Sequence, residues 1–261
     1  MIKALNTAAT GMAAQETNVS TIANNIANVN TNGFKKSRAE FEDLLYETIK
    51  EPGAKSSDNT EYNVGVQIGS GAKVSGTRKV INQGDPNITK NPFDLMINGD
   101  GFFGIQLPNG QTAFTRDGSF NVDKNGVLVD KKGNTVFPGI TVPPNTVNLN
   151  ISENGTVEAY TNGQVEPTNL GTVPVFTFVN PVGLKSVGKN LLMESKASGN
   201  PNQLIPGQDH AGLVVQGALE TSNVSIMNEM TDLIKAQRSY EMNSKVMTIA
   251  DQMLGTINQV R

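Results

Sequence analysis

The placement of glycine and proline constrains this 261-residue chain more than any other sequence feature. All 12 prolines lie within residues 52–206, and all but two of the 26 glycines lie within residues 33–217. Because both residue types destabilise helix interiors, only the two ends of the chain are suited to long helices. The pattern predicts an α+β fold, in which N- and C-terminal long helices form a coiled-coil-like arm and the middle is a mostly antiparallel β domain.

Apolar residues at the N-terminal end recur at spacings of three and four from Ile2 to Val29. Such a heptad pattern is typical of a helix that packs against another helix. We expect a helix over about residues 3–29, ended by the Asn32-Gly33 pair, since both residues tolerate the left-handed conformation that closes helices. The seam of this helix supplies four candidate contacts, which are Leu5, Met12, Val19 and Ile26.

The C-terminal end contains a second run that favours a helix, from a cap at Ser222 or Asn223 to Leu254. One heptad ladder along this run supplies the candidate contacts Ile226, Leu233, Tyr240 and Met247. A second ladder, rotated around the helix, comprises Val246, Ile249, Met253, Ile257 and Val260. Two ladders on one helix indicate packing on more than one partner.

Short alternating runs rich in β-branched and aromatic residues fill the middle of the chain, which predicts strands. Six Asn-Gly, Asp-Gly or Lys-Gly pairs separate these runs and favour tight turns with positive φ angles. The polar stretch Thr48–Asn63 is read as an extended loop or a long exposed hairpin.

We divide the chain into three parts on this basis. Residues 1–33 and 218–261 form a discontinuous terminal helical domain, residues 34–75 form an extended linker or long hairpin, and residues 76–217 form a β-rich outer domain.

Composition excludes several classes of protein. The chain has no cysteine, one histidine and a formal net charge of −3, so disulfide scaffolds, multi-histidine metal sites and nucleic-acid binders are disfavoured. No apolar run approaches the ~20 residues of a membrane span, and the N-terminus is too polar for a secretory signal. We expect export, if it occurs, without a cleaved signal peptide.

No catalytic or cofactor motif has the context that its chemistry needs. Gly99, Gly101 and Gly104 match the dinucleotide-binding pattern, but Phe102 onwards reads as a strand and no helix opens there. Turn-associated carboxylates such as Asp94 and Asp117 leave a soluble glycan-acting enzyme as a distant alternative. The sequence therefore predicts no enzyme activity, no metal and no cofactor.

Several segments resemble the bacterial flagellar rod and hook proteins, and they keep the same order along the whole chain. The segments are 22–35 (IANNIANVNTNGFK), 99–103 (GDGFF), 115–120 (TRDGSF), 219–224 (LETSNV) and 237–245 (QRSYEMNSK). Within that family, the segment after residue 40 resembles the distal rod members. The residues that carry this likeness are Phe41, Leu44, Leu45, Tyr46, Pro52 and Gly53.

The resemblance implies a structural subunit of the distal rod, which is a rigid hollow drive shaft that transmits torque to the hook and conducts exported axial proteins. It implies a homo-oligomeric helical tube, located in the periplasm as part of the basal body. The implied partners are proximal rod and hook proteins, surrounding ring (bushing) proteins and a rod cap during assembly, with no nucleic acid and no membrane insertion. A hook or proximal rod subunit is the near alternative.

The resemblance also assigns the helical ends to the inner wall of the tube, so the seam residues become candidate contacts between subunits. Asn24, Asn25 and Asn28 lie mainly off the seam, and we expect their amides to bridge subunits or to solvate the helix end. We expect Thr48–Asn63 to contact neighbouring subunits.

Overall fold

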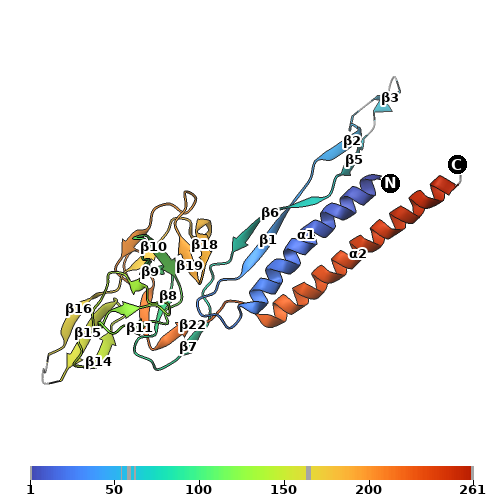
Figure 1. The fold of residues 1–261 in the computed structure, drawn as a ribbon. Coiled ribbons are helices and arrows are strands. Elements are labelled where there is room, and N and C mark those ends of the chain that lie inside the picture. Colours follow the sequence, from blue (N-terminus) through green and yellow to red (C-terminus); the bar gives the residue numbers. More distant parts are fainter. Residues whose placement is uncertain (1, 54, 58–59, 62, 163–165, 260–261) are drawn as a thin grey trace. The chain divides into compact units, whose positions relative to one another are not determined.

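The structure is a computed structural model that describes residues 2–53, 55–57, 60–61, 63–162 and 166–259. The chain forms two compact units (Figure 1). Residues 1–27, 37–79 and 225–261 make the helical unit, and residues 28–36 and 80–224 make the β-rich unit. The backbone therefore passes between the two units four times. The segment expected as a separate linker, 34–75, contributes mainly to the helical unit.

Two long helices, α1 (Ile2–Ala27) and α2 (Ile226–Gln259), pack antiparallel in the helical unit, with the two chain ends at the same end of the pair (Figure 1). A Cβ atom on Gly11 would lie 2.8 Å from the Asn243 side-chain nitrogen, so the helices approach closely there. The buried apolar side chains on the two helices are small, apart from one isoleucine. They are Ala8, Ala14, Ile22, Ala236 and Ala250.

Helix α2 begins at Ile226, later than the cap expected at Ser222 or Asn223, and it continues beyond Leu254. The expected cap is wrong because the Asn223 amide is engaged elsewhere in the β-rich unit. Its Oδ1 accepts from the Lys36 backbone N–H at 2.8 Å, and its Nδ2 donates to the carbonyls of Val80 and Asn82.

An antiparallel ribbon completes the helical unit. Strand β1 (Ser37–Asp43) pairs with β6 (Ala72–Lys79), β2 (Tyr46–Lys50) with β5 (Val66–Gly69), and β3 (Lys55–Ser57) with β4 (Thr60–Glu61). Helix α1 lies against this ribbon, since a Cβ atom on Gly71 would lie 2.1 Å from the Thr10 hydroxyl. The stretch 48–63 is thus a hairpin where it is described.

The β-rich unit is built around β9 (Phe102–Gln106), which pairs with β10 (Thr112–Thr115), β13 (Thr135–Val136) and β17 (Val175–Thr177). The other strands of this sheet are β11 (Asn121–Val122), β12 (Leu128–Val129), β18 (Lys185–Gly188), β19 (Leu191–Met193) and β20 (Asn202–Leu204). A smaller sheet comprises β14 (Thr146–Ile151), β15 (Thr156–Thr161) and β16 (Thr168–Thr172). The remaining pairs are β8 (Leu95–Asn98) with β21 (Leu213–Gln216) and β7 (Pro86–Ile88) with β22 (Ala218–Glu220). Every pairing between these named strands is antiparallel, and the predicted α+β class is confirmed.

Alternation along β9 gives the β-rich unit two apolar clusters, because successive side chains of a strand point to opposite faces. Phe103 packs on one face with Phe120, and their ring centroids are 5.3 Å apart. Phe102 packs on the other face with a group of edge-to-face aromatic rings that includes Phe114 and Phe176. These clusters give the unit a large core of its own.

Most of the described turn glycines follow the expectation of positive φ, including Gly99, Gly126 and Gly155. Gly118 does not, although Asp117-Gly118 is one of the expected tight turns. A Cβ atom there would lie 1.7 Å from the Leu95 carbonyl oxygen, so close backbone packing requires the glycine. Gly163 and Val260, which also entered the sequence predictions, lie outside the described residues.

Candidate functional site

A buried amide ties three elements of the helical unit together. Asn25, near the end of α1, is only 2% exposed. Its Oδ1 accepts from the Ser37 N–H at 2.9 Å, and its Nδ2 donates to the Ser37 carbonyl at 2.8 Å and to Glu229 Oε2 at 3.0 Å. Both amide hydrogens and Oδ1 are therefore engaged within the chain, which leaves only the second lone pair of Oδ1 for a contact with another subunit.

A buried carboxylate in the β-rich unit joins three segments that are far apart in the sequence. Glu220, at the end of β22, is 1% exposed and forms an ion pair with Lys35. It also accepts from the Gly84 N–H at 2.9 Å and from Arg116 Nη1 at 3.2 Å. Lys35 additionally donates to the Asn82 carbonyl at 2.8 Å. This network joins residues that are up to 185 positions apart in sequence.

Burial and ion pairing act in opposite directions on the two cations of this network. Burial lowers the pKa of Lys35, and the hydrogen bond and negative charge of Glu220 partly offset that effect. Burial likewise lowers the pKa of Arg116, and the charges of Glu220 and Asp100 oppose it. Removing the carboxylate would therefore leave two buried cations uncompensated, which is strongly unfavourable.

Sequence reasoning did not single out this ion network. Lys35, Arg116 and Glu220 each lie inside one of the segments that resemble the flagellar family. The available sequence signal was one charged residue in each of three such segments. Only the fold shows that Lys35 and Arg116 both contact Glu220.

The residues predicted as seam contacts divide into two groups. Leu5, Met12, Val19, Ile26, Leu233 and Met247 are half-buried, whereas Ile226 and Tyr240 are exposed. The buried seam of α2 contains small or polar residues between the predicted positions, such as Ala236, Asn243 and Ala250. The predicted ladder therefore follows the α1-facing side of α2 only in part.

The ribbon of the helical unit exposes apolar side chains. Leu45 is 88% exposed, and Phe41, Tyr46, Ile49, Val66 and Ile68 are also exposed. Pro52 and Gly53 are exposed as well, while Leu44 is half-buried. A two-stranded ribbon is marginally stable alone, so such a surface normally packs against something.

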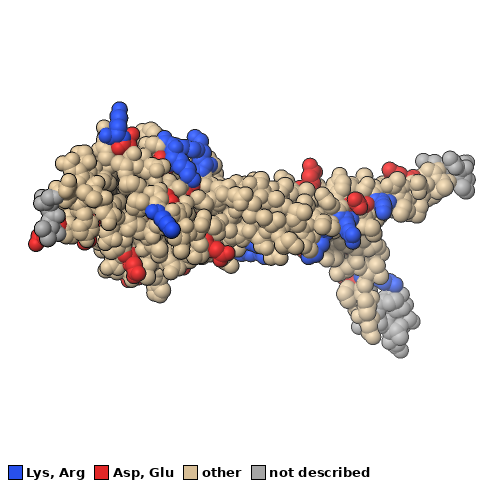
Figure 2. Space-filling model, turned by 90° about the horizontal axis from the view of Figure 1, so that it is seen from below, with Lys and Arg blue, Asp and Glu red and all other residues tan. Residues whose placement is uncertain are grey.

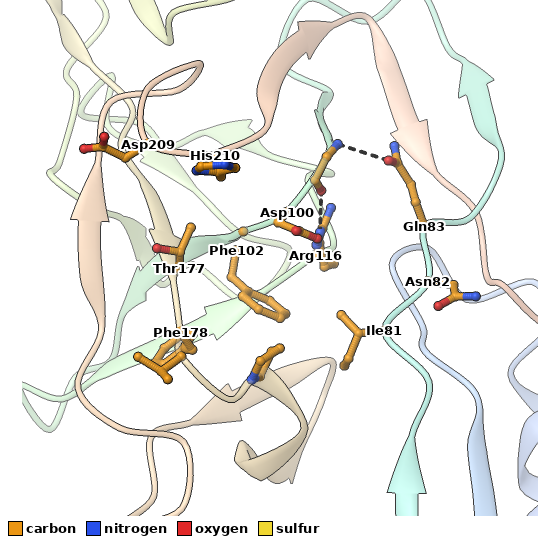
Figure 3. A pocket seen from close by; sticks show the side chains of 14 residues that line it. Ile81, Asn82, Gln83, Asp100, Phe102, Arg116, Thr177, Phe178, Asp209 and His210 are labelled. Carbon is orange, nitrogen blue, oxygen red and sulfur yellow. Dashed lines mark hydrogen bonds between the residues drawn. The ribbon is translucent and has the colours of Figure 1, made fainter.

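A pocket of about 490 Å³ lies in the β-rich unit, with Phe102 and Phe178 on its apolar side and Arg116 below the Gly99–Asp100 turn (Figure 3). Asp209 and His210 line it on the β20–β21 loop, both at positive φ. The candidate carboxylates Asp94 and Asp117 do not line this pocket. Asp94 accepts from Thr89 and Asn91. Asp117 accepts from Ser119 in its own turn and also from Lys131 and Asn190.

Charged side chains are sparse on the face of the helical unit seen in Figure 2. Blue side chains gather at one place on the β-rich unit in that view. Lys131, Lys132 and Lys189 line a small pocket of the same unit. No helix in the described part of the chain has the length and apolarity to cross a bilayer. The described residues also contain no group of three or more His, Asp or Glu side chains arranged to hold a metal ion.

Three family models match successive parts of the chain. Residues 5–35 match the flagella basal body rod protein model, residues 96–159 the D1 domain of the flagellar hook protein FlgE/F/G, and residues 215–260 the C-terminal part of the flagellar basal body rod FlgEFG proteins. The matched ranges include α1, the β9 core and α2. They define the class as hook and rod proteins of the bacterial flagellum.

Full-length relatives narrow this class. The chain is 46% identical over 260 residues to the flagellar basal-body rod protein FlgG of Buchnera aphidicola (subsp. Schizaphis graminum), covering 100% of both chains. It is also 46% identical to FlgG of Caulobacter vibrioides, again over 100% of both chains. The chain belongs to the FlgG family of flagellar basal-body rod proteins. Its function is that of a structural subunit of the basal-body rod.

Among solved structures, the flagellar hook protein FlgE2 of Helicobacter pylori is similar at 13% identity and a TM-score of 0.25. The match covers 71% of this chain and 43% of that one, and it is too weak to support an argument.

Proposed function

We propose that this rod subunit belongs to the distal rod, where copies assemble into a rigid, hollow helical tube that transmits torque to the hook and conducts exported axial proteins. The observation that carries the proposal is the difference in exposure between the two units. The β-rich unit buries most of its large apolar side chains in two clusters, whereas most of those on α2 and the ribbon are exposed. Identical subunits that cover such surfaces through heterologous, non-closing contacts form a helical filament.

The proposed contacts between subunits lie on the two helices. On α1 they are Leu5, Met12, Val19 and Ile26, with Asn24, Asn25 and Asn28 nearby. On α2 they are Ile226, Leu233, Tyr240 and Met247. Half-buried side chains at a seam can gain further burial when a third helix packs alongside, and burial of apolar area stabilises by ~25 cal/mol per Å².

The ribbon is our candidate for the feature that makes the shaft straight and stiff. Its contacts would come from Phe41, Leu44, Leu45 and Tyr46 and from the turn at Pro52-Gly53. A subunit of the hook or the proximal rod, in which these contacts have another role, is the alternative.

The proposed location is the periplasmic part of the basal body, reached by export of the unfolded chain without a cleaved signal. The proposed partners are further copies of the chain, proximal rod and hook proteins, ring proteins around the shaft and a cap during assembly. The proposed role is structural and uses no catalytic residue and no cofactor.

Electron microscopy of the concentrated, purified chain tests the proposal. We expect straight tubes, and we expect helix content, followed by circular dichroism, to rise on assembly because the helices gain packing partners. Dispersed particles at every concentration would contradict self-assembly. Full helix content in the dilute monomer would contradict ordering on assembly.

Deleting residues 48–63 separates the distal rod from its alternative. We expect tubes that bend, while a control in which the same residues are replaced by a Gly/Ser linker of equal length should also bend because the contacts are lost. Straight, stiff tubes from the deletion would contradict the role of the ribbon. Cell-wall hydrolysis that Asp94→Asn or Asp117→Asn abolishes would contradict the structural role itself.

A further inference from the structure

Helix α2 has one side that packs on α1 over most of its length. Its buried and half-buried side chains recur at heptad spacing. They are Glu229, Leu233, Ala236, Asn243, Met247, Ala250 and Leu254. This seam provides a fixed reference direction, from which the position of every other side chain around the helix can be measured.

Nine apolar side chains of α2 lie away from the seam and are 44–77% exposed. The first band, in the first part of the helix, comprises Ile226, Met227, Met230 and Ile234. The second band, further along, comprises Met242, Val246, Ile249, Met253 and Ile257. Both bands lie on described residues of the helical unit, and the described part of that unit leaves each of these side chains at least 44% exposed.

The two bands lie on opposite flanks of the helix. At about 100° per residue, the first band lies roughly 100° to one side of the seam, and the second lies roughly 90° to the other side. A continuous stripe drifts by only ~20° per heptad, so drift cannot move it across the helix in under three heptads. The change of flank occurs between Ile234 and Met242.

In each half of α2, polar residues occupy the flank opposite the apolar band. The two bands are therefore distinct surfaces. Beside the first band, the opposite flank carries exposed Asn228, Asp232 and Lys235. Beside the second band, it carries exposed Ser244, Thr248 and Asp251. Each half of α2 therefore has one apolar flank and one polar flank, and a single neighbouring helix on one side can cover only one of the bands.

We propose that α2 joins two other copies of the chain, one on each side, and that the first band of each copy packs on the second band of the next. This inference rests on the proposed self-assembly. Two α2 helices that run parallel side by side present opposite flanks to each other, so a first band on one flank meets a second band on the other without any further partner. The contact is heterologous and does not close.

The positions of the bands also set an offset between neighbouring copies. The first band is centred near residue 230 and the second near residue 250. At 1.5 Å per residue, pairing them shifts adjacent α2 helices by about 30 Å along their axes. A ring of subunits at one level does not satisfy this shift, whereas a helical arrangement does.

Disulfide trapping tests the pairing directly, because the natural chain contains no cysteine. Met230→Cys and Ile249→Cys are prepared separately, mixed, assembled into tubes and oxidised. We expect cross-linked dimers that contain one chain of each variant, and no cross-linking when either variant is assembled alone. The matched pair Lys235→Cys and Thr248→Cys, on the polar flanks of the same halves, should stay unlinked.

Charged variants test whether both bands are needed. We expect Met230→Glu and Ile249→Glu to abolish tubes individually, and their mixture to give dimers at most, since only one intact pair of bands remains. Lys235→Glu is the control and should form tubes. Circular dichroism of each dilute variant should match the natural chain, because both positions are exposed.

The outcomes separate this inference from the proposed function. If the natural chain forms tubes and copies of one cysteine variant cross-link with each other, like bands pair. That result overturns this inference but not the proposed function. Normal tubes from either charged variant would also overturn it. Failure of the natural chain to form tubes overturns the proposed function, and the inference with it.

Discussion

The two units of this chain differ in how much apolar side-chain surface they bury. The β-rich unit surrounds Phe102, Phe103 and Phe114 with other large side chains, and each of the three is almost fully buried. In the helical unit, the most buried apolar side chains include Ala14 and Ala250, which contribute little area. The β-rich unit is stabilised by its own core. The helical unit buries few large side chains, so it gains stability when further apolar surface is covered.

The difference predicts that the two units unfold independently in the dilute monomer. Hydrogen exchange followed by mass spectrometry reports the free energy of opening for each region separately. We expect slow exchange in the strands around β9 and fast exchange in α1 and α2, and substitutions in one unit should leave the other unchanged.

The largest expected effect follows from Phe103→Ala, which removes a ring from the main cluster of the β-rich unit. Large-to-small substitutions of buried phenylalanine cost about 3–5 kcal/mol. Exchange of β9 and β10 should speed up accordingly, with α1 and α2 unaffected. Val147→Ala is the control, since Val147 is 73% exposed and its loss should change little. Equal acceleration in both units would show that they are one cooperative unit.

A comparable or slightly smaller effect is expected from Glu220→Gln, which removes the ion-pair partner of Lys35 and Arg116. Breaking a buried ion pair costs about 3 kcal/mol or more. The loss should appear in the β-rich unit, at the segments around Gly84 and Ile97, as measured by exchange. Exposed Glu194→Gln serves as the control, and an equal effect from it would remove the special role of the buried network.

The smallest effect is expected from Asn25→Ala in the helical unit. The substitution removes two hydrogen bonds to the Ser37 backbone and one to Glu229, which costs about 1–3 kcal/mol. Exchange should increase at the end of α1 and the start of α2 while the β-rich unit is unchanged. Exposed Asn6→Ala is the control. No change at either helix end would mean that water replaces the amide at no cost.

The sequence predicted the parts of the fold that local rules determine. The two proline-free ends, with one glycine each inside the helical runs, became helices, and alternating runs such as Thr146–Ile151 became strands. On α2, the heptad pattern placed Ile226, Leu233, Tyr240 and Met247 in one ladder. Leu233 and Met247 are half-buried, whereas Ile226 and Tyr240 are exposed. Periodicity predicts the spacing of the residues in a seam. Which of several ladders on α2 forms the seam depends on how α1 packs against it.

The features that the sequence missed depend on contacts between distant residues. Asn223 has the residue type of a helix cap, yet its amide binds backbone groups of Lys36, Val80 and Asn82. Gly118 matches a turn signal, yet it is required by the carbonyl of Leu95. No local propensity specifies such partners, because they are brought together only by the assembled β-rich unit.

The four passages of the backbone between the units have a mechanical consequence. Domains are commonly joined by a linker that few contacts cross, so one flexible segment sets how far they can move. Here four covalent connections join the two units, so a single broken peptide bond after Lys36 or Lys79 leaves the other three intact. The two units therefore stay covalently joined when any one of the four connections is cut.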